Sequence, residues 1–208
     1  MDIAKALLKI KAVFLSPDKP FTWASGIKSP IYCDNRLILT APDVRKLVEE
    51  SIVRKVKEKF PEAEVLMGTS TAGIAHAAIA AWLMDLPMGY VRSGNKDHGR
   101  GNKIEGKLEK GQKVVVIEDL ISTGGSCIEV VETLREAGAD VLGVVSIFTY
   151  GMEKGKQKLK EAGVINYSLT NFDTLCEVAV VEGYITPQDE VKLKKFMENP
   201  SDPSWMEA

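Results

Sequence analysis

Cysteine and histidine are scarce in this chain of 208 residues. The sequence holds three cysteines (Cys33, Cys127 and Cys176) and two histidines. No CxxC pair or Cys/His cluster with metal-ligand spacing occurs, which excludes the usual kinds of zinc site. An odd number of cysteines argues against a disulfide framework and favours a reducing cytoplasm. With two histidines available, a Ser-His-Asp hydrolase is also disfavoured.

An excess of one charge and a long apolar run are missing too. The formal net charge is -2 at pH 7, so the chain lacks the basic excess typical of proteins that bind nucleic acid. No stretch reaches the roughly 18 apolar residues of a membrane span. The N-terminal "MDIAKALLKIKAVF" alternates lysine with apolar residues, unlike a targeting segment. We therefore expect neither nucleic acid nor a membrane as a partner.

Hydrophobic residues make up 45% of the chain, enough for a sizeable core. Strands and helices alternate between about residues 43 and 170. Strands are expected at "EVLMG", "MGYVR", "KVVVIE" and "VLGVVSIF", with helices over about 42–60, 73–84 and 125–137. The strands are almost continuously apolar, which is typical of strands buried on both faces. The pattern predicts an α/β fold with a mostly parallel central sheet flanked by helices.

The two ends of the chain fall outside this alternation. Residues 1–40 and 171–208 are expected to form a small hood on a single domain that spans 1–208. Helical spacing continues from Ile3 to about Phe14, and two short strands surround Ser25-Gly26. Asn171 and Thr186 are candidate N-caps for two later helices, near 171–182 and 187–199. The tail "NPSDPSWMEA" is expected to be frayed.

The segment "VVVIEDLISTGGS", residues 114–126, places two acids beside a loop built to receive an anion. Its second half offers hydroxyls and glycines at a helix N-terminus, where backbone N–H groups and the helix dipole favour phosphate. Because a phosphate would repel Glu118 and Asp119, the acids must serve another part of the ligand. A ribose 5-phosphate meets both needs, since carboxylates accept hydrogen bonds from sugar hydroxyls and stabilise a sugar cation. The bland alternative is a strand-to-helix turn with incidental acids.

Two other loops after strands are polar. "GTSTAGI" supplies hydroxyls and glycines before a helix, which suggests a second phosphate site or a plain capped turn. Residues 92–107 form a basic, glycine-spaced stretch that suggests a clamp over a polyphosphate or a solvated hairpin. His98 lies in this stretch. His76 lies on a helical apolar segment and is interpreted as a packed or capping residue.

These segments resemble a known family. "VVVIEDLISTGGS" resembles the signature of type I phosphoribosyltransferases, and "YVRSGNKDHG" and "FTWASGIKSPIYCDNR" resemble the catalytic loop and the substrate hood of the orotate phosphoribosyltransferases. The resemblance implies Mg²⁺-dependent transfer of phosphoribosyl from 5-phosphoribosyl 1-diphosphate to orotate, which gives orotidine 5-monophosphate and diphosphate in de novo pyrimidine (UMP) biosynthesis. It implies no dedicated protein cage for the metal.

The resemblance also implies roles for residues. Glu118, Asp119 and Lys96 would be catalytic, and Lys96 would stabilise the leaving diphosphate. Orotate would contact Ser122 and, as a hypothesis from the hood, Lys28 or Arg36. A homodimer would share its active sites through the basic loop. The implied phosphoribosyl diphosphate site comprises Thr71, Ala72, Arg92, Lys96, His98, Glu118, Asp119, Leu120, Ile121, Ser122, Thr123, Gly124, Gly125 and Ser126.

The sequence departs from the better-known bacterial pattern at four positions. Ala24, Ala72 and Ser93 stand where many relatives carry lysine, and the segment around Thr149 lacks an orotate-contacting arginine. The residue that neutralises the orotate carboxylate therefore stays open. Two alternatives also remain: a purine phosphoribosyltransferase, and a non-catalytic regulator that senses phosphoribosyl ligands.

Overall fold

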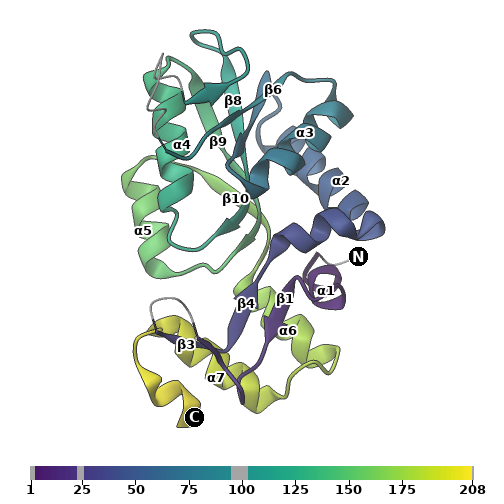
Figure 1. Ribbon diagram of the computed structural model, residues 1–208, viewed down its shortest axis with the longest axis vertical. Coiled ribbons are helices and arrows are strands. Elements are labelled where there is room, and N and C mark those ends of the chain that lie inside the picture. The colour runs from purple at the N-terminus through teal and green to yellow at the C-terminus, as the bar shows by residue number, and fades with distance from the viewer. Residues whose placement is uncertain (1–2, 23–25, 95–102, 208) are drawn as a thin grey trace. The chain divides into compact units, whose positions relative to one another are not determined.

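A computed structural model describes residues 3–22, 26–94 and 103–207 (Figure 1). The chain divides into two compact units. One contains residues 46–169, and the other contains residues 1–45 together with 170–208. In the described part of the chain, no helix is both long and apolar enough to cross a membrane.

Within the described residues, six strands form the central sheet. In chain order they are β5 (Val65–Thr69), β6 (Met88–Val91), β7 (Ile104–Glu105), β8 (Lys113–Ile121), β9 (Asp140–Thr149) and β10 (Asn166–Asn171). Their spatial order is β10-β9-β8-β5-β6-β7. β5 pairs in parallel with β6 and β8, and β8 with β9, whereas β7 runs antiparallel to β6. The predicted α/β fold with a mostly parallel sheet is confirmed.

Helices cover both faces of this sheet. α2 (Pro42–Lys59) and α3 (Ala72–Met84) lie on one side, and α4 (Gly125–Glu136) and α5 (Glu153–Glu161) lie on the other (Figure 1). All five residues of β5 are buried, as are residues 114–118 of β8. The near-continuous apolar strands of the sequence are therefore sandwiched between two helical layers, as expected for a parallel sheet.

The sheet differs from the sequence-based expectation at two points. β8 continues beyond Glu118 to Ile121, because Leu120 and Ile121 pair with Phe148 and Thr149 of β9. Asp119, which the predicted strand did not include, thus lies within β8 together with Glu118. α5 and β10 were not predicted at all, because "EKGKQKLKE" has few apolar residues and the alternation in "NYSLTN" is carried by only two apolar residues, Tyr167 and Leu169.

The other unit is built from short elements. The structure assigns α1 (Ile3–Lys9), β1 (Val13–Leu15), β2 (Phe21–Thr22), β3 (Lys28–Ser29), β4 (Ile31–Cys33), η1 (Asn35–Thr40), α6 (Phe172–Val181), α7 (Pro187–Glu198) and η2 (Pro203–Glu207). The hairpin of β2 and β3 agrees with the prediction of two short strands. Asn171 and Thr186 do cap α6 and α7, and Thr186 forms a capping box with Asp189.

Two predictions for this unit are wrong. The opening helix ends at Lys9 instead of Phe14, because Phe14 pairs with Tyr32 in a sheet of β1 and β4. The tail is not frayed: Trp205 is 1% exposed and stacks edge-on against Phe196, with ring centroids 5.6 Å apart. Burial of a large aromatic side chain is enough to order a segment whose sequence looks like loop.

Candidate active site

The carboxyl ends of β5, β6 and β8 meet at one edge of the sheet, because these strands are parallel neighbours. A cavity of about 40 Å³ lies at this edge. Its lining comes from segments that are far apart in the sequence: Thr69, Ser70, Val91, Arg92, Ser93, Ser126, Glu129 and Val130. The topology thus brings together three of the polar loops that the sequence singled out.

Glu118 is the buried acid of this site, with 5% of its surface exposed. The Thr69 hydroxyl donates to Glu118 Oε1 at 2.6 Å, and the Asp119 backbone N–H donates to the same oxygen at 3.0 Å. Burial raises the pKa of Glu118 to about 8; the hydrogen bond from Thr69 opposes this rise, and the neighbouring Asp119 adds to it. Asp119 is half-buried at the sheet edge. The site therefore pairs a desolvated carboxyl group with a more accessible one.

The loop after β8 has the geometry of an anion site. Gly124 is the N-cap of α4, with φ +76° and no side-chain cap hydrogen bond. The first turn of any α-helix leaves backbone N–H groups without intrahelical partners, at the positive end of its dipole. The residues around Gly124 are open to solvent: Ser122, Thr123, Gly125 and Ser126. Ile121 is 2% exposed, so its side chain belongs to the core.

The backbone of α5 packs against this loop at Ser122, a contact that the sequence did not predict. A Cβ added at Gly155 would lie 2.7 Å from the Ser122 carbonyl oxygen, so the helix backbone touches the loop closely. The backbone N–H of Tyr150 donates to the Ile121 oxygen at 3.0 Å and holds the strand end. The loop is thereby fixed by backbone contacts on two sides.

The loop between β5 and α3 carries Thr71 and Ala72. Ala72 is the first residue of α3 and Thr71 is exposed. The preceding peptide bond, Ser70–Thr71, is cis. The Ser70 hydroxyl donates to the Val91 carbonyl oxygen at 2.5 Å, which joins this loop to the end of β6. Thr71 thus lies in the β5–α3 loop and Ala72 begins α3, next to the loop after β8 in the strand order.

The basic stretch is described only at its two ends. Arg92 follows β6 and forms an ion pair with Glu105, with Nε 3.2 Å from Oε1. Lys103 pairs with Glu129 of α4, with Nζ 3.0 Å from Oε1. The predicted residues Lys96 and His98 lie outside the described residues.

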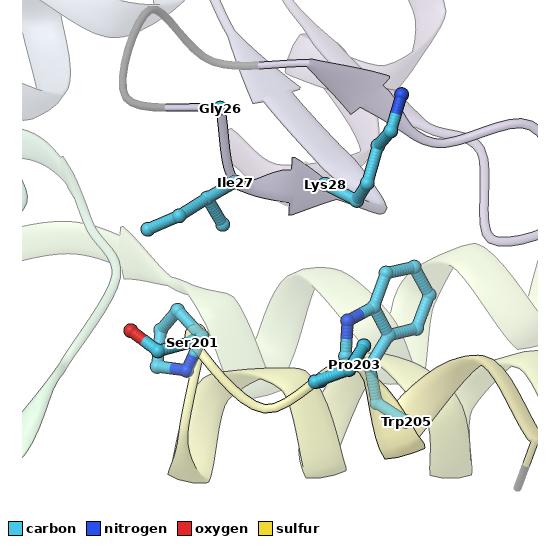
Figure 2. Close-up of a pocket in the computed structure, with 7 residues that line it drawn as sticks. Gly26, Ile27, Lys28, Ser201, Pro203 and Trp205 are labelled. Atoms are coloured by element: carbon cyan, nitrogen blue, oxygen red, sulfur yellow. The ribbon is translucent and has the colours of Figure 1, made fainter.

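Lys28 and Arg36 belong to the unit of residues 1–45 and 170–208, whereas the strand-end residues described above belong to the unit of residues 46–169. Lys28 Nζ donates to Thr22 Oγ1 at 2.7 Å, and Arg36 Nε lies 2.6 Å from Asp34 Oδ1. A pocket of about 350 Å³ lies between residues 26–28 and residues 200–205 of the tail. Figure 2 shows the Lys28 ammonium pointing away from Trp205.

His76 is a packed residue, as interpreted from the sequence. It is fully buried in α3, and its Nδ1 lies 2.6 Å from Oε1 of buried Glu49 in α2. The three cysteines are free thiols. Burial raises the pKa of Cys127, a buried residue in the first turn of α4, far above its ordinary range, so that thiol stays protonated.

Comparisons with known proteins agree with this geometry. A profile of the phosphoribosyl transferase domain matches residues 37–177. A protein of Bacillus cereus (strain G9842) named orotate phosphoribosyltransferase is 58% identical over 207 residues, which is 100% of this chain and 99% of that protein. The chain belongs to the orotate phosphoribosyltransferase family.

Other members of the orotate phosphoribosyltransferase family match over similar lengths. The Listeria monocytogenes serotype 4b (strain F2365) protein of the same name is 59% identical, covering 96% of each chain. The crystal structure of orotate phosphoribosyltransferase from Aeropyrum pernix superposes with a TM-score of 0.76 at 29% identity, covering 88% of this chain and 99% of that one. The family suggested by the acid pair and the hydroxyl/glycine loop is therefore confirmed.

Sequence reasoning missed three contributors to this site. Thr69 was read as part of a glycine- and hydroxyl-rich loop, with no hint of its bond to Glu118. Gly73 and Gly155 were not singled out, although both allow close backbone approach. A glycine at the start of a predicted helix could have indicated the contact at Gly73. Gly155 lies in α5, which was not predicted, so it had no such signal.

Proposed function

We propose that this chain is an orotate phosphoribosyltransferase. It transfers the phosphoribosyl group of 5-phosphoribosyl 1-diphosphate to orotate and gives orotidine 5-monophosphate and diphosphate, in the de novo synthesis of UMP. The observation that carries the proposal is the buried Glu118 beside Asp119, followed directly by the Gly124 loop at the start of α4. Full-length relatives that bear this enzyme's name support the choice of orotate over a purine base.

The reaction needs opposite charges at the two ends of the breaking bond. Cleavage at C1 of the ribose leaves a sugar with cationic character and a departing diphosphate. The carboxyl oxygens of Glu118 and Asp119 accept hydrogen bonds from the ribose hydroxyls, and the negative charge of this acid pair stabilises the positive ring. The amides and hydroxyls of residues 122–126 hold the 5-phosphate. Arg92, Lys96 and His98, with the loop at Thr71 and Ala72, bind the diphosphate.

Magnesium fits this site as an ion bound mainly by the donor itself. In the described residues, no group of three or more His, Cys, Asp or Glu side chains is arranged as a metal site. Mg²⁺ keeps several non-protein oxygens and is often held by substrate phosphates with one or two carboxylates. Diphosphate and ribose oxygens of the donor would supply most of its ligands, so few protein ligands are needed. When bound, Mg²⁺ neutralises charge on the leaving diphosphate.

Recognition of orotate rests on the segment around Lys28 and on Ser122. Because lysines and an arginine of many relatives are replaced at Ala24, Ala72, Ser93 and Thr149, another cation must face the orotate carboxylate. Lys28 is the stronger candidate, since its ammonium group donates a hydrogen bond to the neutral Thr22 hydroxyl, whereas Arg36 already forms an ion pair with Asp34. Orotate affinity should fall in Lys28→Ala and stay near wild type in Arg36→Ala; equal affinity in all three proteins removes the idea.

The enzyme works as a cytoplasmic homodimer in which the basic loop reaches the other subunit's site. α3 supports an interface, because it has no charged residue from Ala72 to Met84 and exposes Trp82 (79%) and Leu83. Free thiols are what a reducing cytoplasm maintains. Mixing inactive Lys96→Ala and Asp119→Asn subunits should restore activity, because hybrid dimers would contain one intact site. No recovery after verified subunit exchange argues against shared sites.

The direct test is orotate-dependent release of diphosphate, measured with and without Mg²⁺. Adenine, guanine and xanthine serve as competing acceptors, and Asp119→Asn as the matched inactive control. If diphosphate is released only when orotate is the acceptor, the proposal is supported. If a purine base drives its release instead, the chain is a purine phosphoribosyltransferase. Binding of phosphoribosyl diphosphate without turnover of any base would instead favour a ligand-sensing regulator.

A further inference from the structure

Thr69 makes one polar contact that the proposed chemistry does not yet explain. Its side chain is 2% exposed at the last position of β5. Its oxygen lies 2.6 Å from Glu118 Oε1 and 3.3 Å from the Ile117 carbonyl oxygen. A hydroxyl has a single proton to donate, so the shorter bond to the carboxylate takes it. The buried Thr69 hydroxyl therefore donates its only proton to the Glu118 carboxyl group.

The position of Thr69 links two loops that would hold opposite ends of the donor. Its backbone leads directly into Ser70 and Thr71, in the proposed diphosphate loop, while its side chain reaches Glu118, 49 residues away, in the ribose region. Ser70 in turn is bonded to the end of β6. A displacement of the diphosphate loop would therefore change the geometry of the Thr69–Glu118 hydrogen bond, which orients Glu118.

Gly73 leaves the space in which this bond forms. A Cβ at Gly73 would lie 2.4 Å from Thr69 Oγ1 and 2.5 Å from the Ile117 oxygen. The first turns of α3 therefore lie directly against the Thr69 hydroxyl and the β8 backbone. The hydroxyl has little freedom to turn elsewhere, so its bond to Glu118 is set by the packing of α3 on the sheet.

We propose that Thr69 is a positioning residue: its hydroxyl fixes the Glu118 carboxylate at the ribose end of the site and ties the orientation of that carboxylate to the diphosphate loop. The role in turnover rests on the proposed function, whereas the link between Thr69 and Glu118 does not. A threonine that merely filled space would be replaced by any side chain of similar volume without consequence for Glu118.

Among the residues that the structure describes, few other titratable groups face Glu118. Asp119 follows it on β8, and Cys127 of α4 is held as a neutral thiol. Its neighbours on the flanking strands, Thr69 on β5 and Ser146 on β9, carry no titratable group. On α3, His76 is turned to Glu49. A change in the titration of Glu118 after mutation of Thr69 can therefore be assigned to the lost hydroxyl.

The first test needs no activity. The side-chain carboxyl ¹³C signal of Glu118 is titrated by NMR in the ligand-free full-length chain, in wild type and in Thr69→Ser and Thr69→Ala variants. Serine and alanine both lack the threonine methyl group and differ only in the hydroxyl. The midpoint should move upward by about one pH unit or more in Thr69→Ala, because a hydrogen bond that favours the ionised form is lost. It should stay near wild type in Thr69→Ser.

The second test measures kcat/KM against pH with orotate and phosphoribosyl diphosphate. Thr69→Ala should lose about tenfold or more, with its acid limb at higher pH, while Thr69→Ser stays near wild type. In a Glu118→Gln background, adding Thr69→Ala should change kcat/KM little. An unchanged Glu118 midpoint in Thr69→Ala, or equal losses in the serine and alanine variants, overturns the inference. Wild type that titrates as expected but does not turn over orotate overturns the proposed function instead.

Discussion

Gly73→Ala adds a single methyl group at the point where α3 touches the site. Gly73 lies in a helix without positive φ, so alanine is compatible with its backbone. The added methyl group would lie 2.4 Å from Thr69 Oγ1 and 2.5 Å from the Ile117 oxygen. Both distances are about 1 Å inside ordinary van der Waals contact. The Ile117 oxygen is backbone and cannot rotate away, so α3 must shift or Thr69 must turn from Glu118.

Two opposing terms set the expected stability. Replacing glycine by alanine within a helix stabilises by roughly 0.5–1 kcal/mol, whereas overpacking a tight site costs about 1–3 kcal/mol. Because two contacts are short and one partner is rigid, we expect a net loss of about 2 kcal/mol in the free energy of unfolding. Turnover should also fall by about tenfold or more, since either relaxation disturbs the bond to Glu118.

The assays are urea unfolding followed by circular dichroism, and orotate consumption followed by absorbance. Gly125→Ala is the matched control for stability: it is also a helical glycine without positive φ, but nothing lies within 4 Å of its added Cβ. Its stability should be unchanged or slightly higher. Gly73→Ala with the stability and turnover of wild type would falsify the idea that α3 sets the Thr69–Glu118 geometry.

Three further outcomes are expected. Trp205→Ala should lower the free energy of unfolding by about 3–5 kcal/mol in urea, because it empties a fully buried aromatic site; no change would mean a loosely held tail. The pKa of Glu118 is about 8 and lies above its ordinary value of 4.5, so its contribution to stability is full below pH 4.5 and is lost as pH rises through about 8. Urea unfolding from pH 5 to 9 should show this decline in wild type and not in Glu118→Gln, which should also lose turnover. EDTA should abolish orotate-dependent release of diphosphate and added Mg²⁺ should restore it; activity that survives complete chelation contradicts the metal requirement.

Local patterns in the sequence were sufficient for the framework of the sheet. The apolar runs of β5, β8 and β9, and the helical spacing of α2, predicted the α/β alternation because burial on both faces leaves a direct mark on composition. The acid pair and the hydroxyl/glycine loop of residues 118–126 could also be interpreted from the sequence, because few ligands need both carboxylates and a helix N-terminus.

Contacts between distant segments could be decided only by the tertiary structure. β8 runs on to Ile121 because β9 offers partners for Leu120 and Ile121, and β1 replaces the end of the opening helix because β4 lies beside it. Trp205 orders the tail by burial against Phe196. Propensity describes a residue with its neighbours in sequence, whereas strand pairing and burial depend on residues that the chain brings back later.

The site shows the same division. The prediction that residues 118–126 receive a sugar phosphate came from the amino-acid sequence alone, because the residues that carry this chemistry are adjacent in the chain. That Glu118 is held by Thr69, and that α5 supports the loop through Gly155, was decided by the fold. The physical reason is that a hydrogen bond across 49 residues and a close backbone approach leave no periodic trace in the chain.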